Sequence, residues 1–264
     1  MASGRFWLPS ILLPAAALAG VAGLAPLVPL SGDLGVMVAA ALAFGCVGAE
    51  VLLASAAAPR FPRRALLLLF VPLSALVALA LLGQAVSAVI AAMVVTACLL
   101  GAGTLIGAKV GAAIERPGHL LVVAIVSALV DAFSVLHPRG PTAQLIEIES
   151  AVAILVLPWP ILGTSRIAPV LGVGDIVFAA LYVAACRRHA LSIPRTVIAL
   201  AIGLGLTFAA AVAAARGVPA LPLMGAAVVI AHPEARRLPP EDRAKALGGI
   251  LALTVLFGVL FALR

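Results

Sequence analysis

Two aspartates lie within long apolar segments of this chain, where an acid usually has a chemical task. Asp131 lies in LLVVAIVSALVDAFSVLH and Asp175 in PVLGVGDIVFAALYVAAC. A charged carboxylate at the centre of a bilayer costs about 2.5 kcal/mol or more, so such a residue marks a candidate functional site. Two carboxylates held close together share one proton. The ionised member can take a proton from water while the protonated member polarises a carbonyl group, which is acid–base hydrolysis.

Two short segments are suited to support such a pair. Gly172, Val173 and Gly174 precede the second aspartate, and we expect the glycines, which lack Cβ atoms, to let the backbone pack closely against a facing helix. Pro219-Ala220-Leu221 opens a later apolar run, where prolines should keep the helix start loose. Irregular backbone at membrane depth is tolerated where it lines a cavity. The predicted site therefore consists of catalytic Asp131 and Asp175, supported by Gly172, Val173, Gly174, Pro219, Ala220 and Leu221.

Polar side chains recur at helical spacing around the two acids. Ser127 and Ser134 lie four residues before and three residues after Asp131, which predicts one polar stripe on that helix. Tyr182 lies seven residues after Asp175 and therefore on the same helix face.

The composition defines the class of protein. The 264 residues are 64% hydrophobic and only 10% charged, and a soluble domain could not cover that much apolar surface. We predict an all-α polytopic membrane protein with a single transmembrane domain over 1–264. Residues 1–112 form its N-terminal helices, 119–232 its catalytic helices and 246–264 its last helix.

About nine apolar segments are candidates for membrane spans. They are 7–30, 35–58, 65–83, 85–108, 119–137, 169–186, 196–215, 219–232 and 246–263. The first resembles a signal peptide, but its apolar run continues to Leu30, so we expect a transmembrane helix. The stretch 151–163 is short and contains Pro158 and Pro160, and we expect a re-entrant, interfacial or extended segment there.

The net charge of +7 comes from basic residues that gather at the ends of the apolar segments. This distribution is typical of topology determinants and not of nucleic-acid binding. The loops 59–64, 109–118, 187–195 and 233–245 hold most of the 17 basic residues. We therefore expect a multi-pass protein of the plasma membrane, with a cytoplasmic N-terminus, an outer C-terminus and the acid pair open to the outer side.

Other reactive residue types have simpler interpretations. The three cysteines (Cys46, Cys98 and Cys186) lie within apolar spans without CxxC spacing and are expected to be buried thiols. No HExxH sequence is present, which argues against a zinc protease, and we expect no metal and no organic cofactor.

Glu50 is a third acid within an apolar span. It could be protonated, could reach toward Arg60 or could line a water path. Gly103, Gly107 and Gly111 recur every four residues, which predicts a helix-packing face and, as an alternative, contact between copies in a homo-oligomer.

At these residues the chain resembles the presenilin/signal peptide peptidase family of GxGD intramembrane aspartyl proteases. That family has an aspartate in one helix, GxGD in the next and PAL at the start of a later one. Here these are Asp131, Gly172–Asp175 and Pro219–Leu221, in the same order. The run 137–147, HPRGPTAQLIE, is similar to the presenilin branch, and the whole resemblance covers about 119–232.

The resemblance implies a presenilin-like fold and an aspartic endopeptidase that cleaves transmembrane helices or signal-peptide remnants in the lipid bilayer. Because a helical peptide bond is shielded, the substrate must unwind, and we expect it to dock by strand addition at 141–168 and 217–222. The chain departs from the family at Val130, where a tyrosine is frequent, and in having four rather than five expected spans before Asp131.

Two other functions fit the same acids. An ion- or proton-coupled transporter could use both aspartates as a relay. A prepilin-peptidase-like GxGD protease would be expected to carry a lysine soon after GxGD and to lack PAL.

Overall fold

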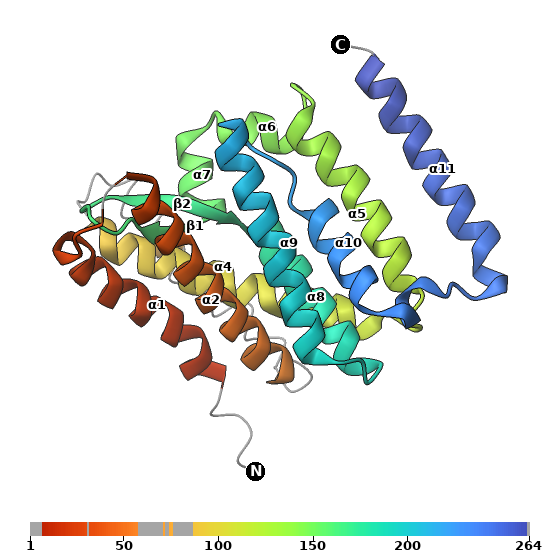
Figure 1. The fold of residues 1–264 in the computed structure, drawn as a ribbon, viewed down its shortest axis with the longest axis horizontal. Helices are drawn as coiled ribbons and strands as arrows, with labels where there is room; N and C mark the ends of the chain where they lie inside the picture. The colour runs from red at the N-terminus through yellow and green to blue at the C-terminus, as the bar shows by residue number, and fades with distance from the viewer. Residues whose placement is uncertain (1–6, 31, 58–70, 72–73, 76–86, 263–264) are drawn as a thin grey trace. The chain divides into compact units, whose positions relative to one another are not determined.

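The computed structural model describes residues 7–30, 32–57, 71, 74–75 and 87–262 (Figure 1). Nearly all regular structure in them is helical. The helices are α1 (Trp7–Leu24), η1 (Ala25–Leu27), α2 (Gly32–Ala57), α4 (Ala88–Ala113), α5 (His119–Leu136), α6 (Pro141–Ile146), α7 (Glu149–Leu155), α8 (Val173–Arg188), α9 (Ile193–Ala214), α10 (Leu221–Ala231), η3 (Pro233–Arg236) and α11 (Pro240–Ala262). The strands are β1 (Val156–Pro160) and β2 (Ile167–Gly172).

The described residues are nearly all-α, and their long apolar helices support the expected membrane protein. Within the described ranges, five helices are long and apolar enough to cross a membrane, namely α2, α4, α5, α9 and α11. Almost all of the predicted span 65–83 lies outside those ranges, as do Arg60, Arg63, Arg64 and Arg264.

The chain forms two compact units. The first comprises 1–109 and 150–181, and the second comprises 110–149 and 182–264. The chain passes between the units three times, and each crossing falls inside a helix, in α4, α7 and α8. Asp175 belongs to the first unit and Asp131 to the second.

The first unit contains an antiparallel hairpin of β1 and β2. Leu157 and Trp159 of β1 are buried, as expected for alternate residues of a strand. Pro158 lies opposite Pro169, and because neither can donate a hydrogen bond, the register shifts beside this pair. Of the three alternatives for 151–163, the extended one is correct from Val156, whereas the preceding residues belong to α7.

The hairpin also corrects one predicted boundary. Residues 169–172 were expected to begin a membrane span, but they belong to β2, and helix α8 begins at Val173. Sequence periodicity could not separate these states, because a short apolar run fits a buried strand and a buried helix equally well.

The turn of the hairpin is fixed against the connection between α1 and α2. The Gly163 N–H donates to the carbonyl of Ala25 at 2.8 Å. Gly163 has φ +79°, and a Cβ atom there would lie 1.4 Å from the Leu30 carbonyl oxygen. Only glycine fits this position, because a side chain would clash and the backbone lies in the left-handed region.

The predicted glycine face of α4 packs against α8 within the first unit. A Cβ atom at Gly103 would lie 2.9 Å from Ile176 Cγ2, and one at Gly107 would lie 2.0 Å from the Val177 carbonyl oxygen. The two glycines therefore bring the α4 backbone close to the residues that directly follow Asp175.

In the second unit, α10 packs against both α5 and α9, and α11 packs against α5 (Figure 1). The close contacts again involve glycines. A Cβ atom at Gly203 of α9 would lie 2.7 Å from the Cα of Met224, and one at Gly225 of α10 would lie 2.9 Å from the Cβ of Ala124. Helix α10 is thereby held firmly between its two neighbours.

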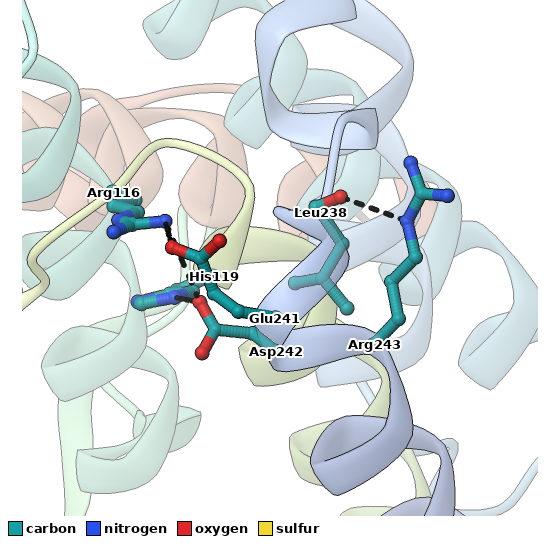
Figure 2. Close-up of polar contacts among 6 residues, drawn as sticks. All are labelled: Arg116, His119, Leu238, Glu241, Asp242 and Arg243. Carbon is teal, nitrogen blue, oxygen red and sulfur yellow. Dashed lines mark hydrogen bonds and ion pairs between the residues drawn. The ribbon is translucent and has the colours of Figure 1, made fainter.

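Helix α11 has no buried side chain and is joined to α5 near both ends. At its start, Glu241 pairs with Arg116 at 2.5 Å, and Asp242 pairs with His119 at 3.0 Å (Figure 2). Such exposed pairs contribute at most about 1 kcal/mol each.

Near its other end, Phe257 stacks on Phe133 with ring centroids 5.0 Å apart, and Phe261 meets His137 edge-on at 5.2 Å. Aromatic pairs of this kind add about 0.5–1.5 kcal/mol beyond the area they bury.

Candidate active site

Asp131 contacts the Pro219-Ala220-Leu221 segment directly. Its carboxylate oxygen Oδ2 accepts a hydrogen bond from the Leu221 N–H at 2.9 Å. The backbone of Ala220 lies close to the same side chain. Because the first N–H groups of a helix have no partner within that helix, half-buried Asp131 serves as the cap of α10.

The sequence around Leu221 explains why this cap comes from another helix. Residues 217–219 are irregular, as expected, and Ala220 has no side-chain oxygen with which to cap the helix. Pro222 has no N–H, so its position in the first turn leaves no extra donor unsatisfied. The first turn is completed by the Met224 N–H, which donates to the Ala220 carbonyl at 3.0 Å. Asp131 thus anchors a helix start that we expected to be loose.

Asp175 also lies at a helix start. It is the third residue of α8, and its Oδ2 accepts a hydrogen bond from the Gly172 N–H at 3.2 Å. An acid at this position that reaches back to the residue before the helix forms one half of a capping box. The positive end of the helix dipole also attracts a carboxylate there.

Within the first unit, Gly172 and Gly174 make no close backbone contact, and their expected packing against the helix of Asp131 stays a prediction. A Cβ atom at Gly174 would meet nothing within 4 Å, and one at Gly172 would only touch the Asp175 carboxylate at 3.4 Å. The close approach of a helix backbone next to Asp175 comes from the glycines of α4 instead.

The predicted polar stripe on α5 has local partners. Ser127 is buried and donates to the Ala124 carbonyl at 3.2 Å. Ser134 lies 2.6 Å from the Thr142 hydroxyl and accepts a hydrogen bond from the Thr142 N–H at 3.0 Å. Ser134 therefore fixes the turn that follows α5.

Tyr182 packs inside the second unit. Its side chain is fully buried, and its hydroxyl interacts with Ser127. A Cβ atom at Gly225 would lie 3.0 Å from the same hydroxyl. The later half of α8 is thus fixed between α5 and α10.

Sequence reasoning missed the cluster at the end of α5. His137 is buried and stacks on Phe133, and its Nδ1 accepts a hydrogen bond from the Arg139 N–H at 3.1 Å. The available signal was aromatic side chains four residues apart on two helices, at Phe133/His137 and at Phe257/Phe261.

The structure therefore joins Asp131 to Ala220 and Leu221, and Asp175 to Gly172. The two aspartates belong to different units, and their pairing stays a prediction. No group of three or more His, Cys, Asp or Glu side chains is placed to hold a metal ion in the part of the chain that the structure describes.

Glu50 is buried in the first unit with 1% of its surface exposed. Neither carboxylate oxygen has a hydrogen-bond partner among the described residues. The alternative in which it reaches toward Arg60 involves a residue outside the described ranges. A buried polar group without a partner costs about 1–3 kcal/mol.

We expect Glu50→Met to raise the free energy of unfolding by about 1–3 kcal/mol, because methionine fills a similar volume without a polar group to desolvate. Thermal unfolding in detergent would measure this change, with exposed Glu149→Met as the control. A lower melting temperature for Glu50→Met would mean that the carboxyl group has a stabilising partner.

The described residues form a nearly all-α fold that has one short β-hairpin and five helices long and apolar enough to cross a membrane, which is typical of an α-helical membrane protein. In comparisons with known proteins, no protein-family model matches the chain and no curated protein is significantly similar to it.

Proposed function

We propose that this protein is an intramembrane aspartyl protease of the presenilin/signal peptide peptidase type, with Asp131 and Asp175 as its catalytic pair. The observation that carries the proposal is the 2.9 Å hydrogen bond between Asp131 and Leu221. The sequence order alone led us to group the first aspartate with Pro219–Leu221, and a direct contact between them is what a shared active site requires.

In the proposed mechanism, one carboxyl group is protonated and the other is ionised. The ionised group takes a proton from a water molecule, which attacks the peptide carbonyl carbon, while the protonated group donates a hydrogen bond to the carbonyl oxygen. The C–N bond of the tetrahedral intermediate then breaks as a carboxyl group gives its proton to the leaving nitrogen. The helix-cap bonds orient both side chains, because each carboxylate is held through Oδ2 by a backbone N–H. Fixed geometry of this kind reduces the reorganisation needed during reaction.

The hairpin is the proposed docking site for an unwound substrate. Its sheet has two strands, so each strand has one edge without a partner in that sheet. Pro158 and Pro160 reduce the donors on β1, whereas β2 contains only Pro169. A peptide added along β2 would be led toward Asp175, because β2 ends at Gly172, which is hydrogen-bonded to that aspartate.

The proposal retains nine spans, a cytoplasmic N-terminus and a site open to the outer side of the plasma membrane. Helix α10 has 11 residues and α8 has 16, both short for a bilayer about 30 Å thick. In this proposal each is extended by the non-helical backbone before it, 217–220 for α10 and β2 for α8. Such backbone is compatible with membrane depth because it lines the proposed cavity.

The direct test uses the purified protein in detergent with a fluorescent transmembrane peptide. We expect cleavage within the apolar segment of the peptide and inhibition by a hydroxyethylene analogue of the tetrahedral intermediate. Mass spectrometry of the products would locate the cleaved bond. Absence of cleavage together with ion flux in proteoliposomes would identify a transporter instead.

A further inference from the structure

A group of exposed basic side chains lies at one end of the second unit. This basic rim consists of Arg188, Arg195, Arg236, Arg237, Arg243 and Lys245. It falls in the loops that the charge distribution assigns to the cytoplasmic side.

Contacts within the unit bring the segments of the basic rim together. Arg188 donates to the Ala112 carbonyl, close to the start of α5. A Cβ atom at Gly118 would lie 2.3 Å from the Arg237 carbonyl oxygen. The hydroxyl of Thr196, the residue after Arg195, lies 2.9 Å from His232 Nε2. Three segments that are far apart in the sequence thus meet at this end.

Several of the guanidinium groups are held in place by carbonyl oxygens. Arg236 donates through Nε to the Val229 carbonyl at 3.0 Å and through Nη2 to the Ile230 carbonyl. Arg243 donates through Nε to the Leu238 carbonyl at 3.1 Å (Figure 2). A carbonyl orients a guanidinium without neutralising it, and each arginine has five N–H donors. These arginines therefore retain charge and donors for another ligand.

Acidic residues at this end do not balance the basic rim. Glu241 and Asp242 are already paired with Arg116 and His119. The other acids in these segments are the exposed Glu115 and Glu234. The rim therefore has an excess of positive charge.

The surface next to the basic rim is apolar. Ile198 of α9 is 60% exposed, Ile230 of α10 is 68% exposed and Leu247 of α11 is 71% exposed. Each lies within a few residues of a rim cation in the sequence. Oriented cations beside exposed aliphatic side chains fit a ligand with an anionic head and hydrocarbon chains.

We propose that the basic rim binds the headgroup phosphate of an anionic phospholipid, with the acyl chains lying along α9, α10 and α11. Arginine suits this role because its planar fork can donate two parallel hydrogen bonds to one phosphate. Prior orientation by carbonyl groups reduces the entropy lost on binding. This site is separate from the aspartates and does not depend on the proposed protease activity.

The test is a lipid titration of the purified full chain in a neutral detergent. Phosphatidylglycerol is compared with phosphatidylcholine of the same acyl chains, and bound lipid is counted by native mass spectrometry. We expect phosphatidylglycerol to bind at least about tenfold more tightly and to lose affinity with added salt, since ion pairing to phosphate is screened.

Two double variants locate the site. Arg236→Gln/Arg243→Gln removes two oriented guanidinium groups and should abolish the preference for phosphatidylglycerol. Arg237→Gln/Lys245→Gln removes two charges whose side chains have no hydrogen bond to a carbonyl among the described residues, and it should weaken phosphatidylglycerol binding severalfold. This second variant keeps the proposal testable if the first one folds poorly. The control, Arg139→Gln/Arg216→Gln, removes the same charge from exposed positions after the C-terminal ends of α5 and α9 and should keep full affinity.

Three outcomes would overturn the proposal. Equal binding of phosphatidylglycerol to the wild type and to the folded rim variants would show that the rim is not the site. An equal loss in the control would show that only net charge matters. Equally tight binding of glycerol 3-phosphate would show a site for free phosphate rather than for a lipid.

Discussion

Asp131→Asn and Asp175→Asn are each expected to reduce cleavage of a transmembrane peptide by roughly 10³-fold or more, because a catalytic pair acts as a unit and losing either member removes most of the catalysis. Asparagine has nearly the same shape as aspartate but can neither take a proton from water nor be protonated to polarise a carbonyl. The reaction therefore loses its acid–base chemistry while the site keeps its shape.

The structure suggests that these variants will fold. The asparagine Oδ1 can accept the hydrogen bond from Leu221 or from Gly172, so the caps of α10 and α8 remain. Circular dichroism and thermal unfolding should match the wild type, which separates catalysis from stability. Alanine at either position should also lower the melting temperature, because the cap is lost at a cost of about 1 kcal/mol.

Asp33→Asn is the matched control for this experiment. Asp33 is an exposed acid in the first turn of α2, so the same chemical change is made at a helix start outside the proposed site. Its turnover should equal that of the wild type. Turnover close to the wild type in either Asp131→Asn or Asp175→Asn would exclude the proposed pair.

Gly107→Val is expected to cause a large loss of stability. A Cβ atom at this position would lie 2.0 Å from the Val177 carbonyl oxygen and 2.9 Å from the Ala180 Cβ. Because the nearest atom belongs to the backbone, α4 and α8 must separate. Overpacking of this kind costs about 1–3 kcal/mol, occasionally more. Since Asp175 is two residues before Val177, peptide cleavage should be lost as well.

The matched control for this variant is Gly48→Val in α2, where a Cβ atom would meet nothing within 4 Å. It introduces the same side chain into an apolar helix of the same unit. Thermal unfolding of both variants in detergent measures the difference. Equal melting temperatures for Gly107→Val and Gly48→Val would contradict this prediction. They would mean that the contact between α4 and α8 tolerates a larger residue and that any change comes from valine within a helix.

Five of the predicted spans correspond to long apolar helices, because a bilayer-length apolar run has few other stable forms. The sequence could not show that α8 begins at Val173, four residues later than expected, since a short apolar run such as 168–172 fits a strand and a helix equally well. The decisive feature was Pro169, which pairs with Pro158 across the hairpin. Pairing of that kind depends on residues that are distant in the sequence.

The candidate site shows the same division between local and distant information. The contact of Asp131 with Leu221 joins two residues that were grouped only by motif order. Close packing was predicted for the glycines of α4, and the structure identifies α8 as the partner of Gly107. Spacing identifies a face that can pack closely, whereas the identity of its partner depends on the fold.

The first unit also constrains how the protein can be synthesised. Its hairpin turn packs on Leu30 and Ala25, but the ribosome makes that turn only after α4, α5, α6 and α7. Helices α1 and α2 are therefore synthesised well before their partner turn, and helix α5 of the second unit emerges in between. Contacts between residues so far apart in the chain form slowly. During that interval the carbonyl groups of Ala25 and Leu30 lack the turn that packs on them, so chaperone contact at these residues would precede assembly of the first unit.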